Sequence, residues 1–326
     1  MIITRAPFRI TLGGGGTDLP SFYEKNEGFV LTMAIDKHIY VTFKKNILEP
    51  KIRLQYLKTE FVDTPRELEH ERAREALLLH GITRGAEISS IADLPSRAGL
   101  GSSGSYLVAL LTALRCYKKL SPEPKIIAEE ACRIEIDTLK EPVGKQDQYI
   151  AAFGGVKSLY IDRHGKVEVE ELDLSQSSMQ DFLSSVHIYY TGVLRSASEI
   201  LKEQSSLQNN AEENLKQIKD IGYEVKESLL SANFDNFGLL MDKHWQLKKQ
   251  LSQKISLPSM DKLYNIVKER FGVLGGKIIG AGGGGFIMLY ASKNRAELES
   301  FMKENGYPRV SYNIDYSGCQ TIVNFG

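Results

Sequence analysis

Hydrophobic and polar positions follow strand and helix spacings in different parts of the chain. Residues 2–12 and 29–43 are rich in Ile, Val, Phe and Thr, which favours strands. Residues 67–80 and 125–139 are typical of helices, with i,i+4 charge pairs along the first of them. Further strands are predicted at 86–94, at 156–161 and 167–172 on either side of a turn at 163–165, and at 186–191.

The pattern changes in the second half of the chain. Residues 196–251 predict long polar helices with apolar residues on spaced faces, with breaks at Asn233 and Pro258. Strands are predicted again at 277–279, 286–290, 311–314 and 321–325. Strands, then helices, then strands indicate the α+β class. At ~150 residues per domain, 326 residues imply two domains, which we place at 1–180 and 181–326, to within about 15 residues.

Charge and cysteine content narrow the kind of partner. Lys and Arg total 41, as do Asp and Glu, so no basic field over the whole protein points to nucleic acid. The three cysteines are widely spaced and form no CxxC pair, which argues against a disulfide framework or zinc ribbon. The N-terminus lacks a signal peptide's apolar region, and the most apolar stretch, 106–114, is shorter than the ~20 residues that span a bilayer. We expect a cytoplasmic protein with small-molecule partners, no nucleic acid and no membrane; its oligomeric state stays open.

Glycines gather in four patches, at 13–16, 99–104, 154–155 and 275–285. Clustered glycines indicate positive φ angles or a close approach of the backbone to another group. The patch in Pro95–Ser105 follows a predicted strand and opens a helix with leucines at helical spacing. Because a helix N-terminus has free amides and the positive end of the helix dipole, it attracts an anion. A plain helix cap with flexible glycines is the alternative.

Three phosphate-binding patterns compete for this patch. The Walker A pattern is not met, because its nearest match, at Lys277, is followed by Ile278. Gly99, Gly101 and Gly104 satisfy the dinucleotide pattern, but no convincing acidic residue follows at the expected distance of ~20 residues. The third pattern, Pro-x-x-Ala-Gly-Leu-Gly-Ser-Ser, resembles the phosphate loop of the galactokinase, homoserine, mevalonate and phosphomevalonate kinases, the GHMP kinases.

This resemblance extends along most of the chain. Residues 6–18 resemble the first GHMP motif, 277–286 the third, and 145–148 with 153–155 the catalytic segment, all in the family's order. The resemblance implies an N-terminal domain like the second domain of ribosomal protein S5 and a ferredoxin-like C-terminal domain, with the active site between them. It also implies ATP as the co-substrate and Mg²⁺.

The first motif resembles one subgroup more than the others. Gly14–Tyr23, followed by Ala34–Lys37, is similar to D-glycero-D-manno-heptose 7-phosphate kinases, which act at the anomeric hydroxyl and to which fucokinases are related. Galactokinases carry Gly-Glu-His-Thr-Asp where this chain has Gly-Gly-Gly-Thr-Asp. The expected product is the 1,7-bisphosphate, used for nucleotide-activated heptose synthesis. Alternatives are a fucokinase or other sugar-1-kinase, an NAD(P)-dependent oxidoreductase, and a non-catalytic nucleotide-binding regulator.

The resemblance also implies catalytic and metal-binding residues. Asp147 matches the base that accepts the proton of the sugar hydroxyl, and Arg9 matches the arginine beside it. Ser103 and Glu135 match the Mg²⁺ ligands. The alternatives are a turn-capping or ion-paired Asp147 and an exposed strand arginine at position 9. Neighbouring acids compete with Glu135: Glu129, Glu130 and Asp137.

Two further sets of residues are implied as ligand contacts, and Arg195 is our candidate for the 7-phosphate because a forked guanidinium suits it. The alternative for Arg195 is an arginine exposed on the surface. The alternative for residues 282–285 is a plain glycine turn between two strands. The set for the nucleotide phosphates is Ser96, Arg97, Ala98, Gly99, Leu100, Gly101, Ser102, Ser103, Gly104 and Ser105. The set for the acceptor is Gly14, Gly15, Gly16, Thr17, Asp18, Gln146, Arg195, Gly283 and Gly284.

Overall fold

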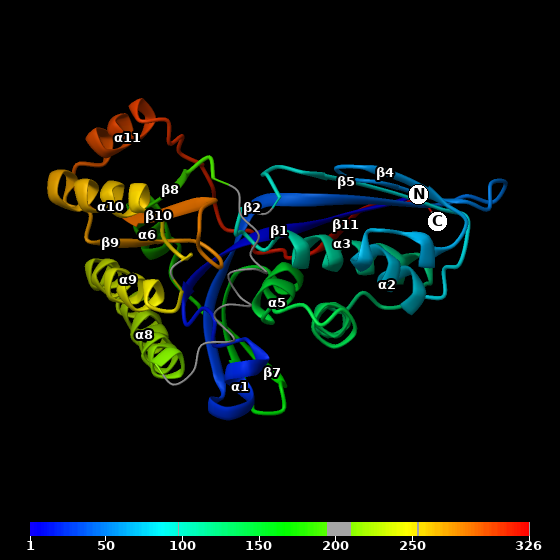
Figure 1. Cartoon of the computed structure of the whole chain (residues 1–326), viewed down its shortest axis with the longest axis horizontal. Coiled ribbons are helices and arrows are strands. Elements are labelled where there is room, and N and C mark those ends of the chain that lie inside the picture. Colours follow the sequence, from blue (N-terminus) through cyan, green and yellow to red (C-terminus); the bar gives the residue numbers. More distant parts are fainter. Residues whose placement is uncertain (97, 194–209, 253, 326) are drawn as a thin grey trace.

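The chain folds around two β-sheets, as the computed structural model shows for residues 1–96, 98–193, 210–252 and 254–325 (Figure 1). The larger sheet and helices α2, α3 and α5 lie on one side of the view, and the smaller sheet with α8–α11 lies on the other. Both chain ends lie together at the far end of the larger sheet. Two sheets, each with its own helices, confirm the predicted two-domain α+β class.

The larger sheet is organised by one long strand, β2 (Gly28–Lys45). Along one edge β2 pairs with β1 (Ile2–Gly13), and β1 pairs in turn with the last strand, β11 (Gln320–Asn324). On its other edge β2 pairs first with β6 (Val156–Ile161) and then with β5 (Ala86–Ala92). β7 (Val167–Glu171) lies beyond β6, and β3 (Ile52–Gln55) and β4 (Thr59–Val62) lie beyond β5. Of these pairs, only β3 with β5 is parallel.

The smaller sheet is antiparallel, in the order β8 (Val186–Tyr190), β10 (Phe286–Tyr290), β9 (Gly275–Ile278). Beyond β8, Arg309 forms an isolated bridge with Tyr189. The prediction of a strand at 311–314 is wrong, because Ile314 makes only an isolated bridge with Ile35. Its neighbour Asn313 is instead held by the Asp36 carboxylate, which accepts hydrogen bonds from the Asn313 amide (2.9 Å) and side chain (3.2 Å).

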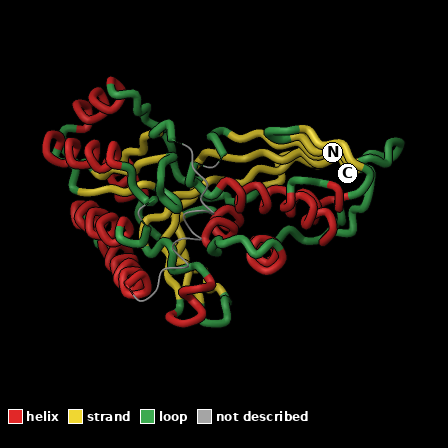
Figure 2. The backbone as a smooth tube through the Cα atoms, in the orientation of Figure 1, coloured by secondary structure: helices red, strands yellow, loops and turns green. Residues whose placement is uncertain are grey.

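Helices pack against both sheets (Figure 2), and all five residues of β10 are buried, so both faces of the smaller sheet are covered. Helix α3 packs on β1 and β2, and α9 packs on β9. Prolines start α1, α4 and α10, where their fixed φ suits the first turn, and the predicted break at Asn233 caps α9. The helices are α1 (Pro20–Asn26), α2 (Glu71–Leu79), α3 (Ser102–Tyr117), α4 (Pro124–Cys132), α5 (Gln146–Phe153), α6 (Gln176–Ser185), α8 (Asn210–Leu230), α9 (Phe234–Lys249), α10 (Pro258–Phe271) and α11 (Arg295–Glu304), with a 3₁₀ turn at Pro65–Glu67 and a π-helix at Arg133–Thr138.

The buried apolar side chains form two clusters, which match the two sheets only in part. The larger cluster lies around β1, β2 and α3 and extends to α8 and α9, and the smaller lies between the second sheet and α10 and α11. β11 is the last strand of the predicted second domain, 181–326, but it pairs with β1 in the larger sheet and so belongs to the first domain. The boundary near residue 180 stays a prediction.

Candidate active site

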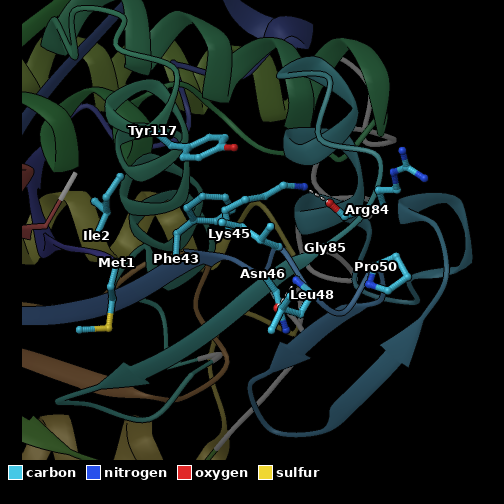
Figure 3. A pocket seen from close by; sticks show the side chains of 11 residues that line it. Met1, Ile2, Phe43, Lys45, Asn46, Leu48, Pro50, Arg84, Gly85 and Tyr117 are labelled. Carbon is cyan, nitrogen blue, oxygen red and sulfur yellow. Dashed lines mark hydrogen bonds between the residues drawn. The ribbon is translucent and has the colours of Figure 1, made fainter.

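A cavity of about 1170 Å³ lies where the elements of the two domains meet. Its lining comes from β1, the loop before α3, the first turn of α5, and from α9 and β9. A smaller cavity of about 730 Å³ at the far end of β2 is lined by Met1, Phe43, Lys45, Arg84 and Tyr117, among others (Figure 3). The lining of the smaller cavity includes no carboxylate, so acid–base chemistry belongs to the larger one.

The predicted phosphate loop forms one wall of the larger cavity. Gly101 caps α3 with φ = +81°, a left-handed conformation that favours glycine, and its carbonyl accepts a hydrogen bond from the Ser105 amide (3.0 Å). The first amides of α3 therefore have no acceptor within the helix and are available to an anion. The loop residues that line the cavity are Ser96, Gly99, Gly101, Ser102 and Ser103.

Four residues of the predicted set for the nucleotide phosphates are not part of the cavity lining. Ala98 and Leu100 are buried behind the loop, and the Leu100 carbonyl accepts a hydrogen bond from the Arg9 amide (3.0 Å). The Ser105 hydroxyl donates to the Pro7 carbonyl (2.7 Å), and Gly104 packs against Asp147. These residues hold the loop in place and do not line the cavity. Arg97 lies outside the described residues.

Arg9 and Asp147 form an ion pair at the centre of the site. Arg9 Nε donates to Asp147 Oδ1 at 2.7 Å, and Arg9 Nη1 donates to the Gly99 carbonyl at 2.5 Å. Arg9 is buried on β1, so the alternative of an exposed strand arginine is excluded. Asp147 lies in the first turn of α5, where the helix dipole favours an acid. A Cβ at Gly101 would lie 3.2 Å from Asp147 Oδ2, which puts this carboxylate against the N-terminus of α3.

Asp18 is a second carboxylate in the wall of the cavity, 1% exposed. Its oxygens accept hydrogen bonds from the amides of Gly16 (3.2 Å) and Gln146 (3.1 Å) and from the Gln146 side chain (3.2 Å). Burial raises the pKa of Asp18, the Gln146 amide counteracts this, and the charge of Asp147 adds to it. Gln146 thus fixes Asp18 to the start of α5, and both residues line the cavity with Gly15 and Gly16.

Thr17 and Gly14, two of the predicted acceptor contacts, are not part of the cavity lining. Thr17 is fully buried, and its hydroxyl lies within hydrogen-bond distance of the carbonyls of Gly14 (2.8 Å) and Phe29 (2.7 Å) while accepting from the Phe29 amide (3.0 Å). Gly14 has φ = +71°, and a Cβ there would lie 2.0 Å from the Phe29 carbonyl. Both residues fix the turn after β1 and neither lines the cavity.

Ser103 and Glu135, the predicted metal ligands, have different surroundings. Ser103 lines the cavity at the second position of α3. Glu135 lies in the π-helical turn, is fully buried, and accepts hydrogen bonds of 2.6 Å from Arg72 Nε and from Gln148 Nε2. Arg72, which the sequence analysis did not single out, lines the cavity and connects Glu135 to it. In the described part of the chain, no group of three His, Cys, Asp or Glu residues is placed to hold a metal.

The third glycine patch packs against the phosphate loop. A Cβ at Gly99 would lie 2.6 Å from the Ile279 carbonyl, and one at Gly285 would lie 2.1 Å from the Ala98 carbonyl. Only glycine permits this contact between two backbones, so the patch is more than a plain glycine turn. The predicted contacts Gly283 and Gly284 are not part of the cavity lining: the Gly283 amide donates to the Ile255 carbonyl (2.8 Å), and Gly284 packs on Val193. Gly280 and Ala281 line the cavity instead, and Arg195 lies outside the described residues.

The sequence analysis missed three residues of the cavity wall, namely His244 and Lys248 on α9 and Lys277 on β9. All three are almost fully buried. His244 and Lys248 are four residues apart and so share a helix face, which was the available signal in the sequence. Lys277 was considered only as part of a failed Walker A pattern.

A glycine loop at a helix N-terminus, facing an aspartate–arginine pair between two α+β domains, defines a small-molecule kinase. The model of the GHMP kinases N terminal domain matches residues 69–155, and that of the GHMP kinases C terminal domain matches 225–307. The chain belongs to the GHMP kinase family. It is a phosphotransferase, a sugar kinase of this family, and the family's kinases use ATP as co-substrate. The oxidoreductase and regulator alternatives are excluded.

Relatives with known names support this assignment. The D-glycero-alpha-D-manno-heptose 7-phosphate kinase of Campylobacter jejuni is 26% identical over 94% of this chain and 94% of that protein. The L-fucokinase/L-fucose-1-P guanylyltransferase of Bacteroides fragilis is 26% identical over 94% of this chain but only 37% of its own length. A solved D-glycero-D-manno-heptose 1-phosphate kinase from Bacteroides thetaiotaomicron shares the fold, with a TM-score of 0.81 at 21% identity over 100% of both chains. Across the described residues, no helix has the length and apolar character needed to cross a membrane.

Proposed function

We propose that the protein transfers the γ-phosphoryl group of ATP to the anomeric hydroxyl of D-glycero-D-manno-heptose 7-phosphate, giving the 1,7-bisphosphate. One observation carries the proposal: the Asp147 carboxylate, paired with Arg9, lies against the N-terminus of α3. A hydroxyl beside Asp147 is thereby placed next to the amides that receive the triphosphate. The names of the Campylobacter and Bacteroides relatives support the choice of sugar.

ATP occupies the side of the cavity formed by the larger sheet. Its phosphates lie on the loop from Gly99 to Ser103, where free amides and the dipole of α3 face the cavity. Its adenine lies towards Tyr56, Leu57 and Ile91, the apolar end of the lining. Leu57 is 82% exposed and Ile91 75% exposed, so an apolar ring over them removes apolar surface from water.

Ser103 supplies a hydroxyl oxygen to Mg²⁺, which keeps most of its other positions for phosphate oxygens and water. Mg²⁺, when bound, neutralises phosphate charge. Ser103 fits this ligand set because its hydroxyl lines the cavity beside the free amides of α3. Glu135 already forms an ion pair with the Arg72 guanidinium at 2.6 Å. It would serve as a ligand of Mg²⁺ only if its carboxylate bound Arg72 and the metal together.

The acceptor lies against Asp18 and the turn at Gly15 and Gly16. Asp18 is held by three N–H donors, and its remaining lone pairs accept hydrogen bonds from sugar hydroxyls. Asp147 orients the anomeric hydroxyl and accepts its proton, while Arg9 stabilises charge on the group in transfer. A fucokinase activity is the second candidate, favoured by the match to the Bacteroides fragilis enzyme.

The test is a direct assay of phosphoryl transfer from Mg·ATP to D-glycero-D-manno-heptose 7-phosphate, L-fucose, D-galactose and D-mannose. We expect the heptose phosphate to have the highest kcat/KM and the product to carry its new phosphate at C1, as ³¹P NMR would show. Asp147→Asn is expected to lower kcat by about 10²–10⁴-fold, the usual contribution of a general base. Turnover of fucose without turnover of the heptose phosphate would reject the proposed acceptor and favour the second candidate.

A further inference from the structure

Three cationic residues of the cavity wall surround a histidine, and all four are buried. His244 and Lys248 come from α9, Lys277 from β9 and Arg9 from β1. Their exposed fractions are 1%, 8%, 2% and 5%, respectively. All four residues belong to the lining of the same cavity, although the ring nitrogens of His244 are themselves buried. We call His244, Lys248 and Lys277 the lysine cluster.

No acidic side chain in the described part of the chain compensates the two lysines. Lys248 Nζ donates only to the carbonyls of Ile278 (3.3 Å) and Gly280, and Lys277 Nζ donates only to the carbonyl of Leu12 (3.3 Å). Neither lysine takes part in an ion pair there, whereas Arg9 is paired with Asp147. Both ring nitrogens of His244 lack a hydrogen-bond partner among the described residues.

Such a cluster is costly in the free protein, since buried charges without a counter-charge lose their hydration. Burial and the charge of Arg9 lower the pKa of Lys248 to about 7, and the same causes, with the charge of Lys248, lower the pKa of Lys277 well below its ordinary value. An anion among these groups would supply the missing counter-charge and the missing acceptors. The cavity is therefore built for a second anion, in addition to the triphosphate.

The position of the cluster shows which anion this is. The triphosphate of ATP has its own site in the amides of the loop and the N-terminus of α3, which belong to the first domain. The lysine cluster belongs to α9 and β9 of the second domain, and the glycine patch that follows β9 packs against the loop through Gly280 and Gly99. In the proposed function the acceptor lies beside Asp147 and Arg9, and the charge of Arg9 acts on both lysines.

We propose that the lysine cluster binds a phosphate monoester already present on the acceptor, at the end remote from the hydroxyl that is phosphorylated. This assignment rests on the proposed function and deepens it: the site selects sugar phosphates over free sugars. It also replaces Arg195, our sequence-based candidate for this phosphate, with three residues that line the cavity. The substrate must then be supplied by a reaction that leaves a sugar phosphorylated at its terminal carbon.

The test compares Lys248→Met, Lys277→Met and a control, Lys243→Met, with wild type. Methionine keeps the volume of each buried side chain without its charge, so the variants are expected to fold with unchanged or higher melting temperatures. Lys243 is an exposed lysine on the same helix and lies outside the cavity. KM is measured for D-glycero-D-manno-heptose 7-phosphate, for the same heptose without phosphate, and for ATP.

We expect each cluster variant to raise KM for the phosphorylated acceptor by about 10- to 100-fold, the usual effect of losing one charge-assisted hydrogen bond. KM for the free heptose and for ATP should stay within about twofold of wild type, and Lys243→Met should change none of them. An equal rise for both acceptors would show a structural role and overturn the assignment. A rise confined to ATP would assign the cluster to the donor and overturn it as well.

Calorimetry without nucleotide separates failure of this inference from failure of the proposed function. The probes are heptose 7-phosphate and mannose 6-phosphate, each with its unphosphorylated sugar. If heptose phosphate is not turned over but monoesters bind wild type and not Lys277→Met, the proposed acceptor fails and the inference stands. If free sugars are phosphorylated and no monoester binds more tightly than its free sugar, the inference fails and the sugar kinase stands.

Discussion

Lys277 lies at a position where a lysine opposes folding. The residue is 2% exposed, its ammonium group has one carbonyl acceptor, and Lys248 and Arg9 are the cations close to it. The unfolded chain exposes the same group to water, where it is fully protonated at neutral pH. Folding therefore removes a stabilised charge, and a neutral side chain of similar volume avoids that cost. A stability measurement thus reports on the side chain independently of catalysis.

Lys277→Met is expected to stabilise the ligand-free protein by about 1–4 kcal/mol at pH 7. Folding lowers the pKa of Lys277. At pH values below its ordinary pKa, the unfolded chain therefore carries a proton on Lys277 that the folded chain either releases or keeps at a cost in free energy. Wild-type stability therefore rises with pH through the window between the folded and unfolded pKa values. The difference between variant and wild type should shrink as pH approaches ~10.5.

Urea unfolding between pH 6 and pH 10 measures this difference. Lys243→Met serves as the control, because its side chain is exposed in both states and its stability profile should follow wild type. A Lys277→Met protein that is less stable than wild type at pH 7 would contradict the expectation. It would mean that the bond to the Leu12 carbonyl outweighs the cost of burial.

The first turns of α3 and α5 meet through a single glycine. A Cβ at Gly104 would lie 2.8 Å from Asp147 Cβ and 3.2 Å from the Gln148 amide. Gly104 lies within α3, so alanine suits its backbone and only the contact with α5 opposes it. The spacing of the two helices sets the distance between the triphosphate amides and the Asp147 carboxylate.

Gly104→Ala is expected to lower kcat about 100-fold, because a shift of roughly 1 Å in a reacting group has that effect. The cost in stability should be small, since overpacking by one methyl costs about 1–3 kcal/mol and the better helix propensity of alanine returns about 1 kcal/mol. Steady-state kinetics and thermal unfolding together give both values.

Gly306→Ala is the matched control for this prediction. Gly306 has φ = +80° and nothing within 4 Å of its added Cβ, so alanine there costs backbone strain without touching the site. We expect it to lose about 1 kcal/mol of stability and to keep wild-type kcat. If Gly104→Ala also kept kcat, the spacing of α3 and α5 would not control the reaction.

Sequence patterns predicted the features that depend on residues close together in the chain, but not those that depend on contacts between distant segments. The loop before α3 was predicted from its glycines and the helix that follows, and the pair of Arg9 and Asp147 from the resemblance to GHMP kinases; both are present. The predicted strand at 311–314 failed because Asp36, distant in sequence, holds that segment by side-chain bonds. The hydroxyls of Thr17 and Ser105 resembled ligand contacts, yet backbone carbonyls accept them. His244 and Lys248 lie in a segment predicted only as polar helices, and the packing of α9 on β9, which is a long-range contact, was not predicted.

At the scale of the molecule, the chain after α11 connects the two domains. It leaves the smaller sheet at the bridge between Tyr189 and Arg309, passes Asp36 and ends in β11, beside β1 (Figure 1). On this path His38 Nε2 and Asp315 Oδ2 are 2.6 Å apart, and both side chains are nearly buried. Asp315 Oδ1 accepts hydrogen bonds from the amides of Ser317 (2.7 Å) and Gly318 (2.9 Å).

The turn at Asp315–Gly318 also supports the catalytic helix from behind. A Cβ at Gly318 would lie 2.3 Å from the Ala152 carbonyl of α5, and the Cys319 amide donates to that carbonyl at 3.3 Å. Burial raises the pKa of Asp315, but hydrogen bonds from His38, Ser317 and Gly318 together lower it below the ordinary value. The carboxylate form thus stabilises the turn, the last strand and the position of α5 at once.

Asp315→Ala is therefore expected to destabilise the protein by about 3–5 kcal/mol, because it leaves His38 buried without its partner. The lowered pKa means that this stabilisation is complete above pH ~4 and is lost as pH falls through the folded pKa, so variant and wild type should converge in acid. Asp93→Ala removes the more exposed acid near His38, at 3.8 Å, and should cost only about 1 kcal/mol. Chemical unfolding of the three proteins at pH 7 and at pH 3 measures both differences. Equal losses for the two variants at pH 7 would show that the buried pair does not hold the C-terminal segment against α5.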